Sequence, residues 1–513
     1  MAALRWLNPV RRRGTEILTP IPTEIYLEIF DHVRFRLPTT SMYPSVRRDL
    51  FSTTLVCHLF RSAVLPLIFE ELTLYPLVYP NLFTSHRDGL FCEHLLEGGP
   101  MAEMMKLYTK TCALCNWDEV TARFEPGKEA GSGAGLYSKV LNTLSNIHTL
   151  SISSIIITKD LLRAMGMLLH LKSLSFEMCL LSEDITEYLE NISSLELKSL
   201  GLQFRATTKP ALLECFICSI NYKCLIELST DNWQFCERMA RGPHPLLLEY
   251  IKIDGRSNAA ILSKLLSKTP VLCRLHIACL PEGSLKLDPG TIPNLKHVVA
   301  PVSILNTFVP GRPISIIEVI DEKDAVLQSF DLEILRSSSC PITDMRIPSE
   351  LYEFQSPFWG QFSYLQVLRL DIFSWVKKTT TSQHALYKKT MSDLLRKRPK
   401  QLTLHTLQLE FMSFDAYPID ILNLRTQYTW LTEIVFPQFP ALRQCQFDKY
   451  FQWFYCAIKL KWEPEVLPAT VGTLLDILAR KDYKDIDLGG FLARLVANSR
   501  NHEHWLNTFR HHQ

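Results

Sequence analysis

The residues best suited to metal chemistry lie between positions 92 and 115. Cys112 and Cys115 have the Cys-x-x-Cys spacing of zinc ligands, and Cys92 and His94 precede them. Four nitrogen and sulfur ligands of this kind could surround one zinc ion as a tetrahedron. We nevertheless expect no metal site here.

A second pair with the same spacing is Cys215 and Cys218. Phe216, Ile217 and Ile220 surround this pair in the sequence. The apolar setting favours two small residues that are buried on one face of a helix. We therefore expect no metal here either.

Signatures of common enzyme classes are missing from the sequence. Residues 131–135 read Gly-Ser-Gly-Ala-Gly, but a phosphate-binding loop needs a Gly-Lys-Ser/Thr ending and a preceding strand, so a linker is the better interpretation. There is no Gly-x-Ser-x-Gly nucleophile elbow and no kinase signature set. There is also no run of eight closely spaced metal ligands, which RING-type enzymes need. We expect no catalytic residues, no cofactor and no enzymatic activity.

The composition argues against several kinds of partner. The 513 residues include 55 basic and 53 acidic side chains, and the net charge of +2 gives no field that would attract nucleic acid or an anionic membrane. The 14 cysteines are scattered singly, which is typical of reduced thiols in the cytosol or nucleus. No apolar run approaches the length of a membrane span, and the first residues do not resemble a signal peptide. We expect a soluble protein of the cytoplasm, the nucleus or both.

The first element that must position functional side chains is an apolar stretch at 21–74. Pro22 suits the first turn of a helix, and Glu24 has the favourable sign for that end of the helix dipole. Ile25, Ile29 and Val33 then recur every four residues, which predicts a helix with a wide apolar stripe. A second apolar segment follows at 55–69. Because roughly fifty residues cannot bury this much apolar surface alone, the stretch is typical of a docking module.

The same stretch resembles the F-box. That family begins with a Leu-Pro-x-Glu-type segment and an aliphatic helix, and it continues with a Leu-Val-Cys/Ser-x-x-Phe-Arg segment that ends in a large apolar residue. The matching segments here are 21–25 (Ile-Pro-Thr-Glu-Ile), 55–61 (Leu-Val-Cys-His-Leu-Phe-Arg) and 67–69 (Leu-Ile-Phe). Ile21 replaces the more usual leucine, and residues 34–46 form a longer connection than the compact version has.

The resemblance implies a module of three helices that binds a Skp-type adaptor and, through it, a cullin-RING ubiquitin ligase. The rest of the chain would then select a protein target. The resemblance covers about a tenth of the chain. The residues that it implies for adaptor binding are Ile21, Pro22, Ile25, Ile29, Leu55, Val56, Cys57, Phe60, Arg61 and Phe69.

The remainder of the chain repeats an apolar-x-x-apolar-x-apolar unit. Clear copies begin at Ile147, Leu171, Leu197, Leu248, Leu272, Leu295, Ile342, Leu365 and Leu404, and weaker copies begin at Leu225, Ile314, Leu431 and Leu442. Most starts between 147 and 365 are 23 to 28 residues apart, which is the period of leucine-rich repeats. Each short strand would bury its alternate apolar residues while the next segment, often a helix, returns the chain. Such helices are expected at 160–169 and 259–266. An irregular βα solenoid is predicted, and an ordinary α/β domain is the alternative.

We therefore divide the α/β chain into five parts. They are a flexible N-terminus (1–19), an F-box-like module of three helices (20–75), a connecting region with a flexible Gly-rich loop (76–136), a leucine-rich-repeat-like solenoid (137–447) and a helical C-terminal cap (448–513). The boundary near 75 rests on Pro76 and Pro80, because proline cannot continue a helix. The cap is expected because a terminal repeat needs a cover.

The middle residue of each strand end should face the open side of the repeats, because side chains alternate across a strand. Among these positions Lys252, His276, Arg346 and Arg369 are basic, and Glu318 is the acidic exception. Arginine holds carboxylate or phosphate groups by paired hydrogen bonds, so one hypothesis is that this face binds an acidic or phosphorylated target. The alternative, which we prefer, is a solvated polar face.

Taken together, the patterns predict a non-catalytic substrate receptor of an SCF-type E3 ubiquitin ligase. It would dock a Skp-type adaptor through its N-terminal helices and an unknown protein target through its repeats. The alternative is a leucine-rich-repeat scaffold that binds protein with no ubiquitin-ligase connection, in which the helical module is only an N-terminal cap. Neither function involves nucleic acid or a membrane.

Overall fold

The chain folds into two compact units, and each is described by itself. The first contains the described residues up to 272 together with Pro281–Lys286, and the second contains Cys273–Leu280 and the described residues from 287 onward. The computed structural model describes residues 11–13, 15–18, 21–35, 50–74, 85–115, 132–288, 290–320, 333–348, 362–372, 402–411, 424–447 and 451–466.

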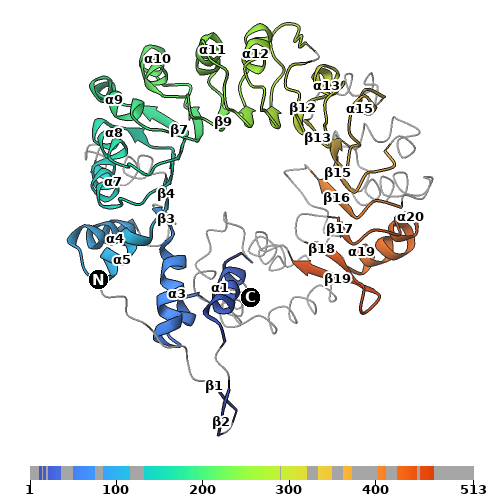
Figure 1. Ribbon diagram of the computed structural model, residues 1–513, viewed down its shortest axis with the longest axis horizontal. Helices are drawn as coiled ribbons and strands as arrows, with labels where there is room; N and C mark the ends of the chain where they lie inside the picture. Colours follow the sequence, from blue (N-terminus) through green and yellow to red (C-terminus); the bar gives the residue numbers. More distant parts are fainter. Residues whose placement is uncertain are drawn as a thin grey trace, which may run out of the picture. The chain divides into compact units, whose positions relative to one another are not determined.

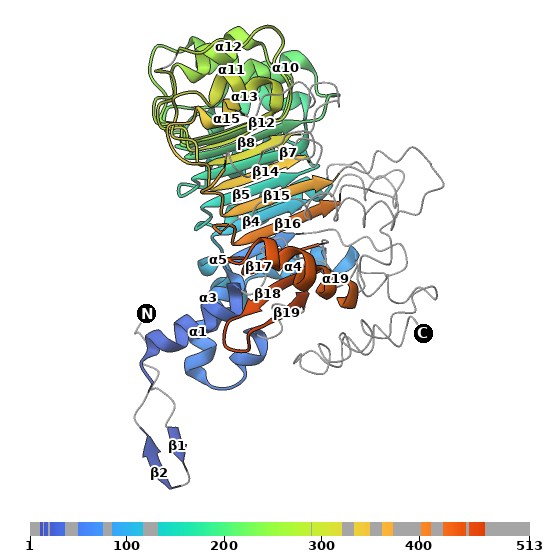
Figure 2. The same cartoon turned by 90° about the vertical axis from the view of Figure 1, so that its right-hand side faces the viewer.

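A parallel sheet organises the first unit. Each strand pairs in parallel with the next, and the strands of the first unit lie side by side in Figure 2. A short strand, β6 (Ile156–Ile157), pairs with the end of β7. In order, the sheet contains β3 (Glu71–Leu74), β4 (Thr111–Cys115), β5 (Thr149–Ser153), β7 (Ser173–Leu181), β8 (Ser199–Phe204), β9 (Glu227–Thr230) and β10 (Tyr250–Ile253).

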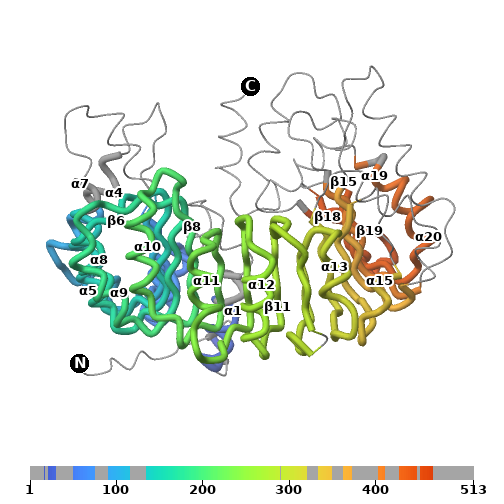
Figure 3. Tube along the Cα trace, turned by 90° about the horizontal axis from the view of Figure 1, so that it is seen from above, coloured from blue at the N-terminus to red at the C-terminus, as the bar shows by residue number. Residues whose placement is uncertain are grey.

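Helices return the chain between these strands and lie along one face of the sheet (Figure 1). Neighbouring returns such as α11 and α12 lie side by side in Figure 3 and are in contact. The returning segments are α4 (Ser85–Glu97), α5 (Pro100–Tyr108), α7 (Ser132–Thr143), α8 (Lys159–Gly166), the 3-10 helix η1 (Glu183–Tyr188), α9 (Glu190–Ser193), α10 (Pro210–Ser219), α11 (Trp233–Arg241) and α12 (Ala259–Leu266). The helices predicted at 160–169 and 259–266 are confirmed as α8 and α12.

The predicted apolar repeat forms the core of this sheet. Leu150, Leu174, Leu200 and Leu228 occupy equivalent positions on successive paired strands, and all are at most 1% exposed. Thr158 accepts a hydrogen bond from the backbone N–H of Leu161 at the start of α8, which is the role of an N-cap residue. Alternating apolar side chains therefore build the repeats, and side-chain caps begin the return helices α8, α11 and α12.

The N-terminal region contributes a hairpin and three helical segments. β1 (Arg11–Arg13) and β2 (Glu16–Leu18) pair antiparallel, within the lead-in that the sequence suggests is flexible. α1 (Thr23–Phe35), a helical segment at 50–54 and α3 (His58–Phe69) follow. Residues 36–49, which include most of the long connection expected at 34–46, lie outside the described residues.

A second run of parallel strands organises the second unit. β11 to β17 pair in sequence order, and β17, β18 and β19 then pair antiparallel. The strands are β11 (Arg274–Ile277), β12 (His297–Pro301), β13 (Ile316–Ile320), β14 (Asp344–Pro348), β15 (Val367–Ile372), β16 (Thr406–Phe411), β17 (Gln444–Gln446), β18 (Phe451–Cys456) and β19 (Lys461–Val466). The helices are α13 (Val302–Phe308), α15 (Glu333–Arg336), α19 (Leu424–Trp430), the π-helical turn η3 (Leu431–Val435) and α20 (Phe436–Gln438).

The structure differs from the sequence-based prediction in four places. The repeat sheet already includes β3 and β4, before the predicted start at 137. α7 begins at Ser132, inside the predicted Gly-rich loop, because its next turns bury Tyr137 and Val140. The weak repeat at Leu431 is helical. The described part of the predicted helical cap is the hairpin of β18 and β19, which buries Phe451 and Trp453.

None of the helices among the described residues has the length and apolar character needed to cross a membrane.

Arg312 joins two segments of the second unit, 288–291 and 307–310, by hydrogen bonds. Its side chain is buried, 2% exposed, and its guanidinium donates to five backbone carbonyls: those of Thr291, Thr307, Phe308, Pro310 and Asp288. Two of these acceptors belong to the last turn of α13, whose carbonyls have no partner within the helix. Burial lowers the pKa of the Arg312 guanidinium. The backbone carbonyls therefore provide its stabilising partners.

We expect Arg312→Met to lower the free energy of unfolding by about 2–4 kcal/mol, because each buried carbonyl left without a donor costs about 1–3 kcal/mol and part of that cost will be relieved by relaxation. The measurement is urea-induced unfolding followed by circular dichroism. The control is Arg336→Met, which removes an exposed ion pair between Arg336 and Glu333 within the short helix α15. It should change the free energy of unfolding by about 0.5 kcal/mol or less. Equal losses in the two variants would contradict the role of Arg312.

Candidate functional site

The helices of the N-terminal module share a small aromatic and aliphatic core. Tyr26 and Phe30 of α1 are buried against Val64 and Ile68 of α3. Phe60 packs between the two aromatic residues, with ring centroids 4.9 Å from Tyr26 and 5.2 Å from Phe30. Edge-to-face and tilted aromatic pairs at these distances are stabilising. This core fixes one side of α1 and leaves the adjacent side uncovered.

The uncovered side of α1 carries two of the predicted adaptor-binding residues. Ile25 is 44% exposed and Ile29 is 48% exposed. They are four residues apart, so they lie one above the other on the same face of the helix. Pro22, at the start of the helix, is also exposed.

The turn before α3 carries two more of the predicted adaptor-binding residues. Leu55 is 86% exposed and Val56 is 67% exposed. Backbone hydrogen bonds from Leu55 to Ser52 and from Val56 to Thr53 hold the turn, and the thiol of Cys57 accepts from the backbone N–H of Phe60 at 3.5 Å. The backbone is thus held in place while the apolar side chains point away from the core. Ile25, Ile29, Leu55 and Val56 are called the exposed apolar set below.

Three of the other predicted adaptor-binding residues contribute to the core of the module. Ile21, Phe60 and Phe69 are half-buried and pack against the buried cluster. Cys57 is half-buried at the start of α3, and Arg61 is exposed. The structure therefore separates the predicted residues into an exposed group and a group that also stabilises the module.

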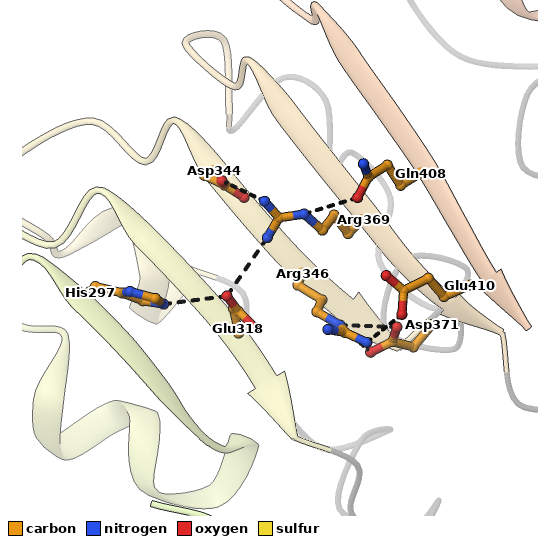
Figure 4. A network of polar contacts seen from close by, with 8 residues as sticks. All are labelled: His297, Glu318, Asp344, Arg346, Arg369, Asp371, Gln408 and Glu410. Carbon is orange, nitrogen blue, oxygen red and sulfur yellow. Dashed lines mark hydrogen bonds and ion pairs between the residues drawn. The ribbon is translucent and has the colours of Figure 1, made fainter. Parts of the chain in front are cut away.

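The predicted target-binding arginines lie on one face of the second unit's sheet, and Figure 4 shows their surroundings. Arg346 on β14 donates from Nε to both carboxylate oxygens of Asp371, at 3.1 and 2.9 Å, and from Nη2 to Glu410 at 2.6 Å. These groups belong to three adjacent strands, β14, β15 and β16. Arg346 is therefore an ionic link across the sheet.

Arg369 makes a second link of the same kind. Its Nη2 donates to Asp344 at 3.2 Å, its Nε donates to Gln408 at 3.1 Å, and its Nη1 lies 3.7 Å from Glu318. Glu318 also lies 3.4 Å from His297. The contacts extend over β12 to β16 (Figure 4).

The sign of the charge on this face differs from the sequence-based hypothesis. Four carboxylates surround two guanidinium groups, so with His297 neutral the formal charge is −4 + 2 = −2. The predicted cationic character of Arg346 and Arg369 is therefore wrong, because both charges are already compensated within the sheet. Burial raises the pKa of Asp371 and of Asp344, against the opposing effect of the neighbouring arginines. His297 lowers the pKa of Glu318.

Lys252 and His276 are the other two predicted target-binding residues. Lys252 belongs to the first unit, where its Nζ lies 2.8 Å from Asp254, and Asp254 also accepts from Gln203 at 2.8 Å. His276 is half-buried on β11 of the second unit.

The cysteine pairs show two different environments. Cys92 and Cys112 are buried, Cys115 is half-buried, and burial raises the pKa of the Cys112 and Cys115 thiols. Within the described residues no three potential ligands gather around a common point. Cys215 and Cys218 are both exposed, so the prediction that they are buried on a helix face is wrong.

Three of the four acidic partners in Figure 4, Asp344, Asp371 and Glu410, were missed by the sequence analysis. A signal for them exists, because Asp344 and Arg346, Arg369 and Asp371, and Gln408 and Glu410 are pairs two residues apart on single strands. Residues two apart face the same side of a strand. The pairing across strands also needs the register, which the apolar pattern of one strand does not provide.

Comparison with known proteins gives little support for assigning a family or a function. No family model matches the sequence, and no curated protein does. One matching solved structure is described as the crystal structure of the Rad7 and Elc1 complex in yeast. It is 13% identical, and the match covers 67% of this chain and 71% of that chain with a TM-score of 0.27. A TM-score this low carries no argument about function.

We expect Arg346→Met to destabilise the second unit by roughly 1–3 kcal/mol, because it leaves Asp371, whose side chain is 8% exposed, without its counter-charge. Adding Asp371→Asn should restore about half of the loss, since no uncompensated charge then remains buried. The measurement is a double-mutant cycle by urea unfolding. Losses that simply add would show that the two groups are not coupled.

Proposed function

We propose that this chain is the non-catalytic substrate-recognition subunit of an SCF-type E3 ubiquitin ligase. Its N-terminal helices dock a Skp-type adaptor, which links it to a cullin-RING ligase, and its repeats bind a protein target. The chain acts in the cytoplasm, the nucleus or both, and it uses neither a cofactor, nucleic acid nor a membrane. The F-box resemblance of segments 21–25, 55–61 and 67–69 names the partner.

The observation that carries this proposal is the exposed apolar set. A module with its own core could also have turned Leu55 and Val56 inward, yet they are 86% and 67% exposed. Single exposed apolar residues are common, but several on one small module mark an interaction site. Burying one such side chain under a partner contributes about 1.5–3 kcal/mol, so a few anchors of this size would dominate the interface.

A scaffold without a ligase connection is the second candidate, and one contact favours it. α3 packs against both α5 and β3, and it buries Val64, Leu65 and Ile68. α3 therefore lies next to the first strand of the sheet, where a cap would lie. A cap accounts for α3, but it gives no reason for Ile25, Ile29, Leu55 and Val56 to remain exposed.

The test is binding of the full chain to a purified Skp-type adaptor, measured by isothermal titration calorimetry. We expect Ile25→Asp with Leu55→Asp to weaken binding by at least about 100-fold, since each lost anchor should cost at least about 1.4 kcal/mol. Thermal stability should change little, because both side chains are exposed in the free chain.

The matched control is Ile458→Asp, which places the same charge on an aliphatic residue that is 94% exposed in the hairpin of β18 and β19. It should leave adaptor binding unchanged. Failure of the unmodified chain to bind the adaptor, with the fold intact, would favour the scaffold.

A further inference from the structure

Four successive strands of the first unit share a feature at one edge of the sheet. The residues immediately before β4, β5, β7 and β8 are Lys110, His148, Lys172 and Lys198. His170 lies beside them, with its ring centroid 6.0 Å from that of His148. These five residues are called the basic edge below.

Backbone hydrogen bonds keep the basic edge in register. The backbone N–H of His148 donates to the carbonyl of Lys110 at 2.7 Å, that of Lys172 donates to His148 at 2.8 Å, and that of Lys198 donates to Lys172 at 2.7 Å. Neighbouring strands are separated by about 4.8 Å, so the three intervals span about 14 Å, the length of roughly four residues of extended chain. The basic side chains thus form a row of fixed spacing.

The charges of this row are only partly compensated. Lys110 pairs with Glu70 at 3.1 Å, and Glu196 is an exposed acidic neighbour in the sequence of Lys198. Lys172 and Lys198 are exposed, and neither forms an ion pair with any residue of the described ranges. Burial lowers the pKa of His148, and the positive charges of Lys172, His170 and Lys110 lower it further. The imidazole therefore experiences a net positive field.

Large apolar side chains lie near the basic residues in the sequence, at the end of α5 and between α8 and β7. Leu107 is 56% exposed, Met167 is 68% exposed and Leu169 is 88% exposed. The side chain of Asn146 donates to the carbonyl of Leu107 at 2.8 Å, which joins the turn before β5 to the last turn of α5. The edge thus offers both cationic and apolar contacts.

We propose that the basic edge is a docking site for an acidic peptide segment that also carries apolar side chains. Its carboxylates would contact Lys172 and Lys198, with Lys110 and the two histidines beside them, and its apolar residues would pack on Leu107, Met167 and Leu169. The proposal does not rest on the adaptor interaction, because it uses repeat residues only.

The dimensions favour a peptide over the other polyanions. A row about one side chain wide and about 14 Å long suits a short extended segment. Nucleic acid binding normally requires several phosphate contacts within a broad basic field, and the net charge of the chain is only +2. A lipid surface would need a wider basic and apolar area.

In the experiment, peptides that bind the full chain are selected from a displayed random library. The residue types enriched among the selected peptides are then compared between the unmodified chain and its variants. The unmodified chain should enrich sequences that combine Asp or Glu with large apolar residues. Lys172→Glu with Lys198→Glu should reduce that enrichment by at least about tenfold, because attraction is replaced by repulsion at both contacts. Circular dichroism should show that this double variant is folded, since the two lysines are exposed.

The control is Lys159→Glu with Lys209→Glu, which gives the same change in net charge at exposed lysines of the same unit that pair with Asp184 and Glu183. It should keep the enrichment. The proposal is overturned by absence of acidic enrichment or by equal loss in the two double variants. It is also overturned if the basic edge instead controls sedimentation with phosphatidylserine–phosphatidylcholine vesicles and no peptide is selected.

Discussion

The register of the parallel strands is the constraint on which the other features depend. Because Leu150, Leu174 and Leu200 occupy equivalent buried positions on hydrogen-bonded strands, each strand is held against sliding. A shift by one residue would move its apolar side chains out of the core. Residues at the same repeat position are consequently aligned across the sheet. Both the ionic links of the second unit and the basic edge of the first unit are rows of this kind.

The helical module is connected to the same sheet through α3. α3 contributes Val64, Leu65 and Ile68 to buried contacts, and it leads directly into β3. The buried side chains of α3 are therefore needed for folding. The side chains of Ile25, Ile29, Leu55 and Val56 are exposed, and their exposure is a stability cost that a partner could offset. This division separates residues needed for folding from residues available for binding.

The sequence predicted most of the repeat strands because three apolar residues at fixed spacing identify a buried strand without knowledge of its neighbours. β4 escaped this pattern, since its buried positions are Cys112 and Leu114 and the third apolar residue is replaced by Thr109. The pattern at Leu431 is equally compatible with a helix, which is what Leu431–Val435 forms. The pairing of Arg346 could not be predicted, because it depends on contacts between segments that are distant in the sequence.

The charge of a repeat surface therefore follows from rows of side chains and not from residue types within one repeat. Considered strand by strand, Arg346 and Arg369 suggest a cationic face, yet adjacent strands supply Asp371, Glu410 and Glu318. These carboxylates compensate the charges of both arginines and link the strands to one another. At the basic edge the neighbouring rows supply fewer carboxylates, and Lys172 and Lys198 keep their charges exposed within the described part of the chain. A cationic residue type is thus informative about binding only after its neighbours across the strands are known.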